Sequence, residues 1–246
     1  MKNRVTIKSE ARQLIQTGRV SPILMSLIVL LIVSVFDVLS TLSDFGTITV
    51  EDLQYMITSG DVSVLLNATQ ISSPMQPFLP ILISLLTSVL YAGYYSYCMG
   101  IYHGEEMQIS SLANGLGIIG QLIWCEILMA IKVFLWSLLF FIPGIIASYR
   151  YRFAIYNLLH DPSLTASQAI ALSCRQTNGM KFDLFILDLS FLGWNILTGL
   201  TLGILSIWTL PYTTLSDLGY YNEAQKKLTP VMPGDEPQNQ DPSWRF

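Results

Sequence analysis

Residues 118–159 read IIGQLIWCEILMAIKVFLWSLLFFIPGIIASYRYRFAIYNLL, and most of these side chains are apolar. A helix crosses the hydrocarbon core of a bilayer in about 20 residues, so this stretch is long enough for two crossings. Pro143 and Gly144 interrupt the stretch, and these two residue types commonly end or bend helices. We therefore predict two membrane helices here, at 118–141 and at 144–160.

The composition of the whole chain agrees with a membrane protein. Of its 246 residues, 52% are hydrophobic and 12% are charged, whereas an average soluble domain is about 25% charged. This low charge predicts an integral membrane protein whose main partner is the lipid bilayer. No basic patch with interleaved aromatic side chains occurs in the sequence, so nucleic acid is not expected as a partner.

Applied to the whole chain, the same reasoning predicts an all-α, polytopic membrane protein with about six transmembrane helices. The membrane domain covers 22–222 and follows an N-terminal amphipathic segment at 1–21. Residues 223–246 are rich in Pro, Asp and Gln and are predicted to form a disordered cytosolic tail. The predicted spans lie near 22–42, 78–100, 118–141, 144–160, 182–200 and 203–222.

Two short helices are expected on the membrane surface. Residues 1–21 place apolar side chains at helical spacing among Lys and Arg, which is typical of an interfacial amphipathic helix. Between spans four and five, Asp161 can cap a helix, Pro162 suits its first position and Asn178-Gly179 suits its end. The polarity of 162–178 places this second helix on the cytosolic surface.

The distribution of Lys and Arg predicts the orientation of the spans. The loop at 44–77 contains acidic residues and no Lys or Arg, so it is expected outside the cell. Six spans then leave both termini in the cytosol of a multi-pass cell-membrane protein. A five-span alternative, in which 118–160 crosses once, would place Arg175 and Lys181 outside, and it is disfavoured for that reason.

Several charged residues fall inside the predicted spans. The fifth span reads FDLFILDLSFLGWNILTGL, and its Asp188 would cost roughly 2.5–3.5 kcal/mol to insert near the bilayer centre. Such residues usually pair with one another in the protein interior. Counted along the spans, the side chains of similar depth form a candidate intramembrane polar cluster of Glu126, Arg150, Arg152 and Asp188 and a candidate second pair of Asp37 and Lys132.

Two interpretations of these charges remain open from the sequence. The pairs can simply orient the helices, or they can line a polar path or cavity for an ion, a proton or a polar headgroup. Tyr149 and Tyr151 lie deeper than a membrane interface, so we expect their hydroxyl groups to face the charge cluster.

The motifs of common enzymes do not occur. The sequence has no G-x-S-x-G, H-E-x-x-H or Walker-type glycine loop. His103, Glu105 and Glu106 are adjacent in a loop, which is a poor arrangement for a closed metal site. We therefore predict no catalytic residue, no metal and no cofactor, and we do not expect an enzyme.

Five stretches of the sequence together resemble a known family. They are PGI (143–145), SYRYRFAIYNLLHDP (148–162), ALS (171–173), GMKFDLFILDLSFLGW (179–194) and TLGILSIWTLPY (201–212), followed by Tyr221. The chain, from roughly 20 to 225, resembles the bacterial integral-membrane family known as domain of unknown function 975. The resemblance implies a multi-span plasma-membrane protein with cytosolic termini, and it implies no activity and no catalytic residues.

Together these observations predict a non-enzymatic accessory or scaffold protein of the bacterial envelope, which could bind a membrane or cytosolic protein partner. The alternative is a small transporter or lipid-handling protein that uses the intramembrane charge cluster. An intramembrane hydrolase is a third possibility.

Overall fold

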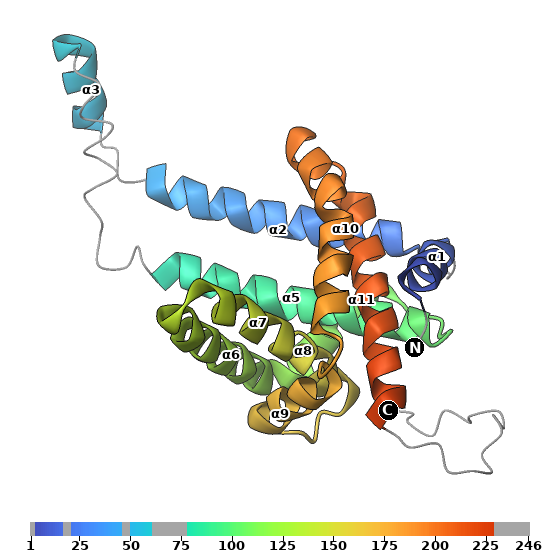
Figure 1. Cartoon of the computed structure of the whole chain (residues 1–246). Coiled ribbons are helices and arrows are strands. Elements are labelled where there is room, and N and C mark those ends of the chain that lie inside the picture. The colour runs from blue at the N-terminus through green and yellow to red at the C-terminus, as the bar shows by residue number, and fades with distance from the viewer. Residues whose placement is uncertain (1–2, 17–20, 46–49, 61–77, 229–246) are drawn as a thin grey trace, which may run out of the picture.

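The computed structural model of the protein describes residues 3–16, 21–45, 50–60 and 78–228 (Figure 1). Within these ranges the regular structure is all helical, which confirms the all-α part of the predicted fold class. The elements are α1 (Arg4–Leu14), α2 (Pro22–Phe45), α3 (Val50–Ser59), α5 (Phe78–Tyr102), the 3-10 helix η1 (Ile109–Ile118), α6 (Ile119–Leu139), α7 (Phe141–Tyr151), α8 (Ala154–His160), α9 (Ala166–Gln176), α10 (Lys181–Leu200) and α11 (Ser206–Leu228). Most of the predicted tail, 229–246, and most of the 44–77 loop lie outside the described residues.

Four of the predicted spans correspond to helical segments long and apolar enough to cross a membrane. These segments are Pro22–Thr41 in α2, Pro80–Tyr102 in α5, Ile109–Leu138 in η1 and α6, and Lys181–Leu200 in α10. Among the described residues, the helices at the other two predicted spans do not meet this criterion. The span predicted at 144–160 is divided between α7 and α8, and the span predicted at 203–222 corresponds to the less apolar α11.

The long apolar stretch divides three residues before the predicted position. The backbone turns at Phe140, whose φ and ψ of −160° and 150° are those of an extended residue. Pro143 falls within the first turn of α7, where a proline is tolerated because the N–H that it lacks would have no partner in the helix. Gly144 faces Ser137 so closely that a Cβ atom would overlap the serine side chain, and this allows α6 and α7 to pack tightly as a hairpin.

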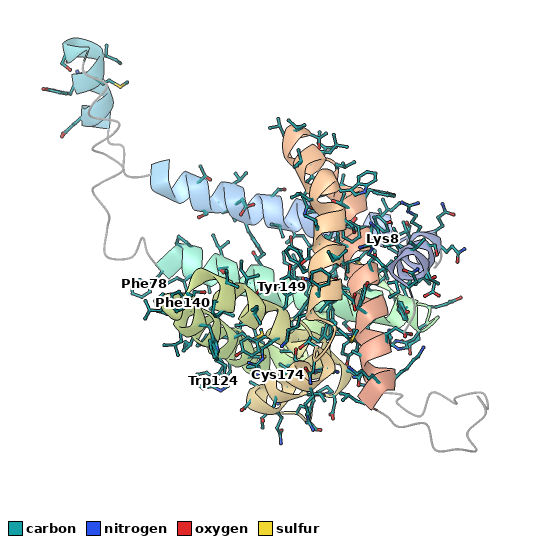
Figure 2. All side chains as sticks on the ribbon, viewed as in Figure 1. Lys8, Phe78, Trp124, Phe140, Tyr149 and Cys174 are labelled. Atoms are coloured by element: carbon teal, nitrogen blue, oxygen red, sulfur yellow. The ribbon has the colours of Figure 1, made fainter. Side chains whose placement is uncertain are left out.

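The core of the molecule surrounds α11. This helix packs against α1, α2, α5, α9 and α10, and its buried face includes Tyr212, Leu215, Leu218 and Tyr221. In Figure 1, α10 and α11 run across the direction of α2, α5 and α6. The crossing region is therefore the packed part of the molecule, whereas the far ends of α5 and α6 expose Phe78 and Phe140 (Figure 2).

Two glycines allow η1 to lie directly on α5. A Cβ atom at Gly93 of α5 would overlap the backbone carbonyl of Leu112, and one at Gly115 of η1 would lie 2.6 Å from the carbonyl oxygen of Val89. Small residues at such contacts let helix backbones approach one another closely. The segment predicted as a loop after the second span is thus partly a helix that is fixed against α5.

The first helix is amphipathic, as predicted, but its apolar face is not available to lipid. Ile7 and Ala11 are buried, and Ile7 lies where a Cβ atom would extend from Gly219 of α11. On the adjoining side, the Arg12 Nε donates a hydrogen bond to the Tyr212 hydroxyl at 3.1 Å. The apolar face that was expected to lie on the bilayer is therefore covered by α11, and the position of this helix relative to a membrane stays a prediction.

The helix predicted at 162–178 begins four residues later, at Ala166. Thr165 and Gln168 form a capping box, in which each side chain bonds to the backbone of the other residue. Asp161 instead accepts hydrogen bonds from the backbone N–H and the hydroxyl of Ser163. The surface prediction holds for one face of α9 only, since the opposite face is buried at Ala166, Ala169, Ile170, Ser173 and Gln176.

Candidate functional site

The site begins at a break in the backbone between α7 and α8, at Arg152 and Phe153. Such a break removes intrahelical partners from nearby backbone groups, and these need replacements when they are buried. Ser173 of α9 supplies two, because its hydroxyl accepts from the Phe153 N–H at 3.1 Å and donates to the Arg150 carbonyl at 2.8 Å. The Thr177 hydroxyl donates to the same carbonyl at 3.3 Å. Hydrogen bonds from the side chains of Ser173 and Thr177 therefore stabilise the backbone at this break.

A pair of amides fixes α9 to α8 next to this break. The Asn157 Nδ2 donates to the Gln176 Oε1 at 2.9 Å, and the Gln176 Nε2 donates to the Asn157 Oδ1 at 2.8 Å. Asn157 also donates to the Ala169 carbonyl at 3.1 Å. Both side chains are buried, where their polar atoms cannot bond to water. Each amide therefore supplies the hydrogen-bond partners that the other amide needs.

At the break, the Arg152 side chain joins two helices that are distant in sequence. Its Nη1 lies 2.6 Å from the Asp188 Oδ2 and its Nη2 lies 2.7 Å from the Asp188 Oδ1, which is a bidentate pair. The same Nη2 donates to the Asp217 Oδ1 at 2.8 Å and to its Oδ2 at 3.0 Å. One guanidinium group thus binds a carboxylate from α10 and a carboxylate from α11.

A tyrosine completes this group of side chains. The Tyr149 hydroxyl of α7 donates to the Asp188 Oδ2 at 2.8 Å, as the sequence predicted, and the Arg152 guanidinium lies 5.7 Å from the Tyr149 ring centre. The ion-paired side chains are 21% exposed for Arg152, 39% for Asp188 and 18% for Asp217. We call these four residues the Arg152 cluster; one guanidinium and two carboxylates give it a formal charge of −1.

The structure brings together only part of the predicted polar cluster. Arg152 and Asp188 are in contact, whereas Glu126 accepts a hydrogen bond from the Ser88 hydroxyl of α5. The Arg150 side chain faces a pocket between α6, α7 and α9. Arg150 and Arg152 are two residues apart, and on a helix this spacing directs side chains to nearly opposite faces.

The second predicted pair, Asp37 and Lys132, is not brought together. Asp37 lies on the exposed surface of α2, and Lys132 faces the same pocket as Arg150. Within the described part of the chain, the two side chains form no ion pair. The depth estimate assumed parallel helices in one bundle, and this assumption does not hold for helices that cross.

Sequence reasoning did not include Asp217 in the cluster. The turn between α10 and α11 contains Gly203, with a positive φ of 86°. Asp188 precedes this glycine by about as many residues as Asp217 follows it, so an antiparallel pair of helices places both at the same level. This symmetry was the signal in the sequence that could have identified Asp217.

A helical chain with four segments that can cross a membrane, joined by a partly buried ion cluster, has the features of a multi-helix membrane-associated protein. Residues 138–227 match the model of the family described as "Protein of unknown function (DUF975)". The predicted resemblance is therefore confirmed for this stretch, which includes the whole Arg152 cluster, although it was expected from about residue 20. No curated protein and no solved structure matches the chain.

Proposed function

We propose that the chain is a non-enzymatic integral membrane protein of the bacterial cell membrane that serves as an accessory or scaffold protein. The observation that carries the proposal is the Arg152 cluster, in which one guanidinium binds carboxylates from two helices. Both of its terminal nitrogens are engaged, so the group is suited to joining α7, α10 and α11 rather than to binding a substrate. Pairing in the interior of a helix bundle is the usual way in which charged residues are accommodated in a membrane.

The topology we propose has six crossings, with α7 and α8 together as the fourth and α11 as the sixth. Contacts between distant segments support it. The Lys227 Nζ near the end of α11 donates to the Asn178 carbonyl before α10 at 2.7 Å, and α1 packs against α11 around Gly219. The N-terminal helix, the turn before α10 and the end of α11 are therefore close to one another. Six crossings put all three in the cytosol, whereas five would place α1 and Asn178 on opposite sides.

Partner analysis tests the accessory role. The tagged chain is purified in mild detergent from its native membrane, and the proteins that accompany it are quantified by mass spectrometry. A membrane or cytosolic protein at a fixed molar ratio is expected. A chain that purifies alone from its native membrane, or that turns over a lipid substrate in a hydrolase screen, would contradict the proposal.

A second candidate function is transport or lipid handling at the Arg152 cluster. It is favoured by the extra carboxylate, since one guanidinium faces two carboxylates and Asp188 is 39% exposed. A proton or a cation could balance that charge. In proteoliposomes, this function predicts a solute flux that depends on pH and is lost in a folded Asp188→Asn variant. An accessory role predicts that the variant changes stability and leaves any flux unchanged.

A further inference from the structure

A second polar feature lies on the other side of α7 from the Arg152 cluster. It is a pocket of about 580 Å³ between α6, α7 and α9. Its lining residues include Lys132, Trp136, Arg150, Ser167, Cys174 and Arg175. Figure 2 labels one of these residues, Cys174, on α9.

Three of the lining side chains carry a positive charge, and they come from three different helices: Lys132 from α6, Arg150 from α7 and Arg175 from α9. No Asp or Glu is among the lining residues, and none of the three cations forms an ion pair with a residue that the structure describes. Three like charges around one cavity repel one another unless an anion lies between them. The charge of this pocket is thus opposite to that of the Arg152 cluster.

Other lining groups suit an anion that carries oxygen atoms. Ser167 contributes a hydroxyl donor and Tyr151 a phenol, and the Lys132 Nζ lies 5.9 Å from the centre of the Tyr151 ring. Arginine forms two parallel hydrogen bonds with carboxylate or phosphate groups, and lysine adds a point charge. A tetrahedral phosphate group suits donors that come from three different helices better than a flat carboxylate does.

The surroundings of the pocket indicate where the anion comes from. On one side, α6 exposes the large apolar side chains of Phe134, Leu135 and Leu138, and on the other, α9 exposes a face that includes Ser167 and Arg175. Trp136, which is amphipathic and 42% exposed, lies at this boundary. Positively charged groups beside exposed apolar surface suit a ligand that has a charged head and apolar chains.

We infer that this pocket binds the phosphate group of an anionic ligand. The exposed apolar surface of α6 beside the pocket favours one such ligand, an anionic phospholipid that offers its phosphodiester headgroup. The ligand's phosphate oxygens accept hydrogen bonds from Arg150, Arg175 and Lys132, and its acyl chains lie along the exposed apolar surface of α6. This site is separate from the Arg152 cluster and does not depend on the accessory role.

The test compares two variants that lose the same number of positive charges. The pocket variant is Lys132→Gln, Arg150→Gln and Arg175→Gln, and the control variant, away from the pocket, is Arg4→Gln, Lys181→Gln and Lys226→Gln. Phosphatidylglycerol and phosphatidylcholine are titrated against the detergent-solubilised full chain, and the bound lipid is counted by native mass spectrometry. At about 1 kcal/mol per cation, the pocket variant is expected to bind phosphatidylglycerol about 100-fold more weakly than the unmodified chain. The control variant should bind it as the unmodified chain does.

The outcomes separate the possible ligands. Tight phosphatidylglycerol binding that the pocket variant loses supports a lipid headgroup. Displacement of this lipid by millimolar inorganic phosphate would show that the pocket recognises a free phosphate equally well. Equal losses in both triple variants, or equal binding of phosphatidylcholine and phosphatidylglycerol, would overturn the inference.

A second measurement keeps the inference testable if the pocket variant does not fold. Cys174 lines the pocket and is partly exposed, whereas Cys98 and Cys125 are buried. In the unmodified chain, phosphatidylglycerol should slow the alkylation of Cys174 by a maleimide, and phosphatidylcholine should not. An alkylation rate that is the same with both lipids counts against the site.

Discussion

The helices α2 and α11 are of similar length, but they behave in opposite ways. The segment of α2 that is apolar enough to cross a membrane lies within Pro22–Thr41 and has a mean hydropathy of 2.7. Only 17% of its residues are buried inside the protein. The less apolar α11 contains Thr, Ser, Tyr and an internal Pro211, and nearly half of its 23 residues are buried. The most apolar helix is thus on the outside, and a more polar helix is at the centre.

This difference is the one expected of a protein whose surrounding solvent is lipid. Lipid is as apolar as a leucine side chain, so apolar residues gain little by leaving lipid for the protein interior. Packing between helices depends instead on small residues and on hydrogen bonds. On α11, the missing side chain of Gly219 leaves room for Ile7. The Tyr212 hydroxyl accepts a hydrogen bond from Arg12, and Asp217 forms an ion pair with Arg152. High hydropathy therefore marks the surface that faces lipid, and small or polar residues within an apolar helix mark the packed core.

The largest effect is expected from Arg152→Met. Without the guanidinium, Asp188 and Asp217 remain as two carboxylates without their partner. Removing one member of a buried ion pair typically costs about 3–5 kcal/mol, which is an upper bound for this partly exposed cluster. The melting temperature in detergent, followed by size-exclusion chromatography, should fall strongly. Arg150→Met is the matched control and should melt close to the unmodified chain, since the Arg150 side chain faces the pocket.

Charge exchange tests the same contact from the other direction. A chain with Arg152→Asp and Asp188→Arg should recover part of the folded yield that either single substitution loses. A double variant that folds no better than the two singles would show that the pair contributes no specific contact energy.

A smaller loss is expected for Asn157→Ala. The substitution leaves Gln176 buried without its amide partner, and an unsatisfied buried polar group costs about 1–3 kcal/mol. Hydrogen exchange in α8 and α9 should accelerate. Asn195→Ala, on the exposed surface of α10, is the control and should leave exchange in these helices unchanged. Equal effects of the two substitutions would remove the distinction between core and lipid-facing surface.

Gly93→Ala should produce a loss of similar or smaller size, about 1–3 kcal/mol, because the new methyl group overlaps the Leu112 backbone. Backbone cannot move aside as easily as the end of a flexible side chain. Gly193→Ala makes the same chemical change on α10, where the new methyl group has open space. Thermal unfolding followed by circular dichroism should separate the two variants, with only Gly93→Ala less stable.

The smallest effect is expected from Lys8→Met. Burial, followed by the neighbouring charges of Arg12 and Arg4, lowers the pKa of Lys8 below its usual 10.5. The charged amine therefore opposes the docking of α1, although its Nζ lies 4.2 Å from the Phe191 ring centre and 3.1 Å from the Ser190 hydroxyl. We expect a change in stability of less than about 1 kcal/mol.

The sign of the pH dependence follows from the lowered pKa. Below the pKa of the folded state, Lys8 is charged in both the docked and the undocked form, and docking carries the full penalty. As the pH rises from the folded-state pKa to 10.5, the docked form releases its proton first and gains stability. Comparing the melting temperatures of the two chains across this range should show the gain only in the chain with Lys8.

The sequence predicted the helical spans best where apolar runs are long and uninterrupted. The helices α2, α5, α6 and α10 begin and end within a few residues of the predicted spans. The turn at Phe140 was misplaced because Pro143 can sit inside the first turn of a helix as well as end one. The burial of α1 and α9 could not be predicted, because an amphipathic pattern identifies an apolar face and does not say whether lipid or protein covers it.

The candidate site was predicted in part, for a related reason. Asp188 and Arg152 stood out because charge is rare in apolar helices, and opposite charges attract. Glu126 and Lys132 satisfied the same rule but face other groups, Ser88 and the pocket. Depth along a helix gives one coordinate of a side chain, and the direction in which it points depends on helix crossings that a single sequence does not specify.

The spacing of the Arg152 cluster along the chain has a consequence for how the protein is made. Arg152 leaves the ribosome 36 residues before Asp188 and 65 residues before Asp217. At about 5–20 residues per second, roughly 3–13 s pass before the last carboxylate is synthesised. A lone arginine is costly inside a bilayer, so in the proposed six-crossing topology the segment that carries it should wait at the water interface until α10 and α11 arrive. In that topology the order of translation makes the entry of α7 and α8 a late step, completed by the helices that follow them.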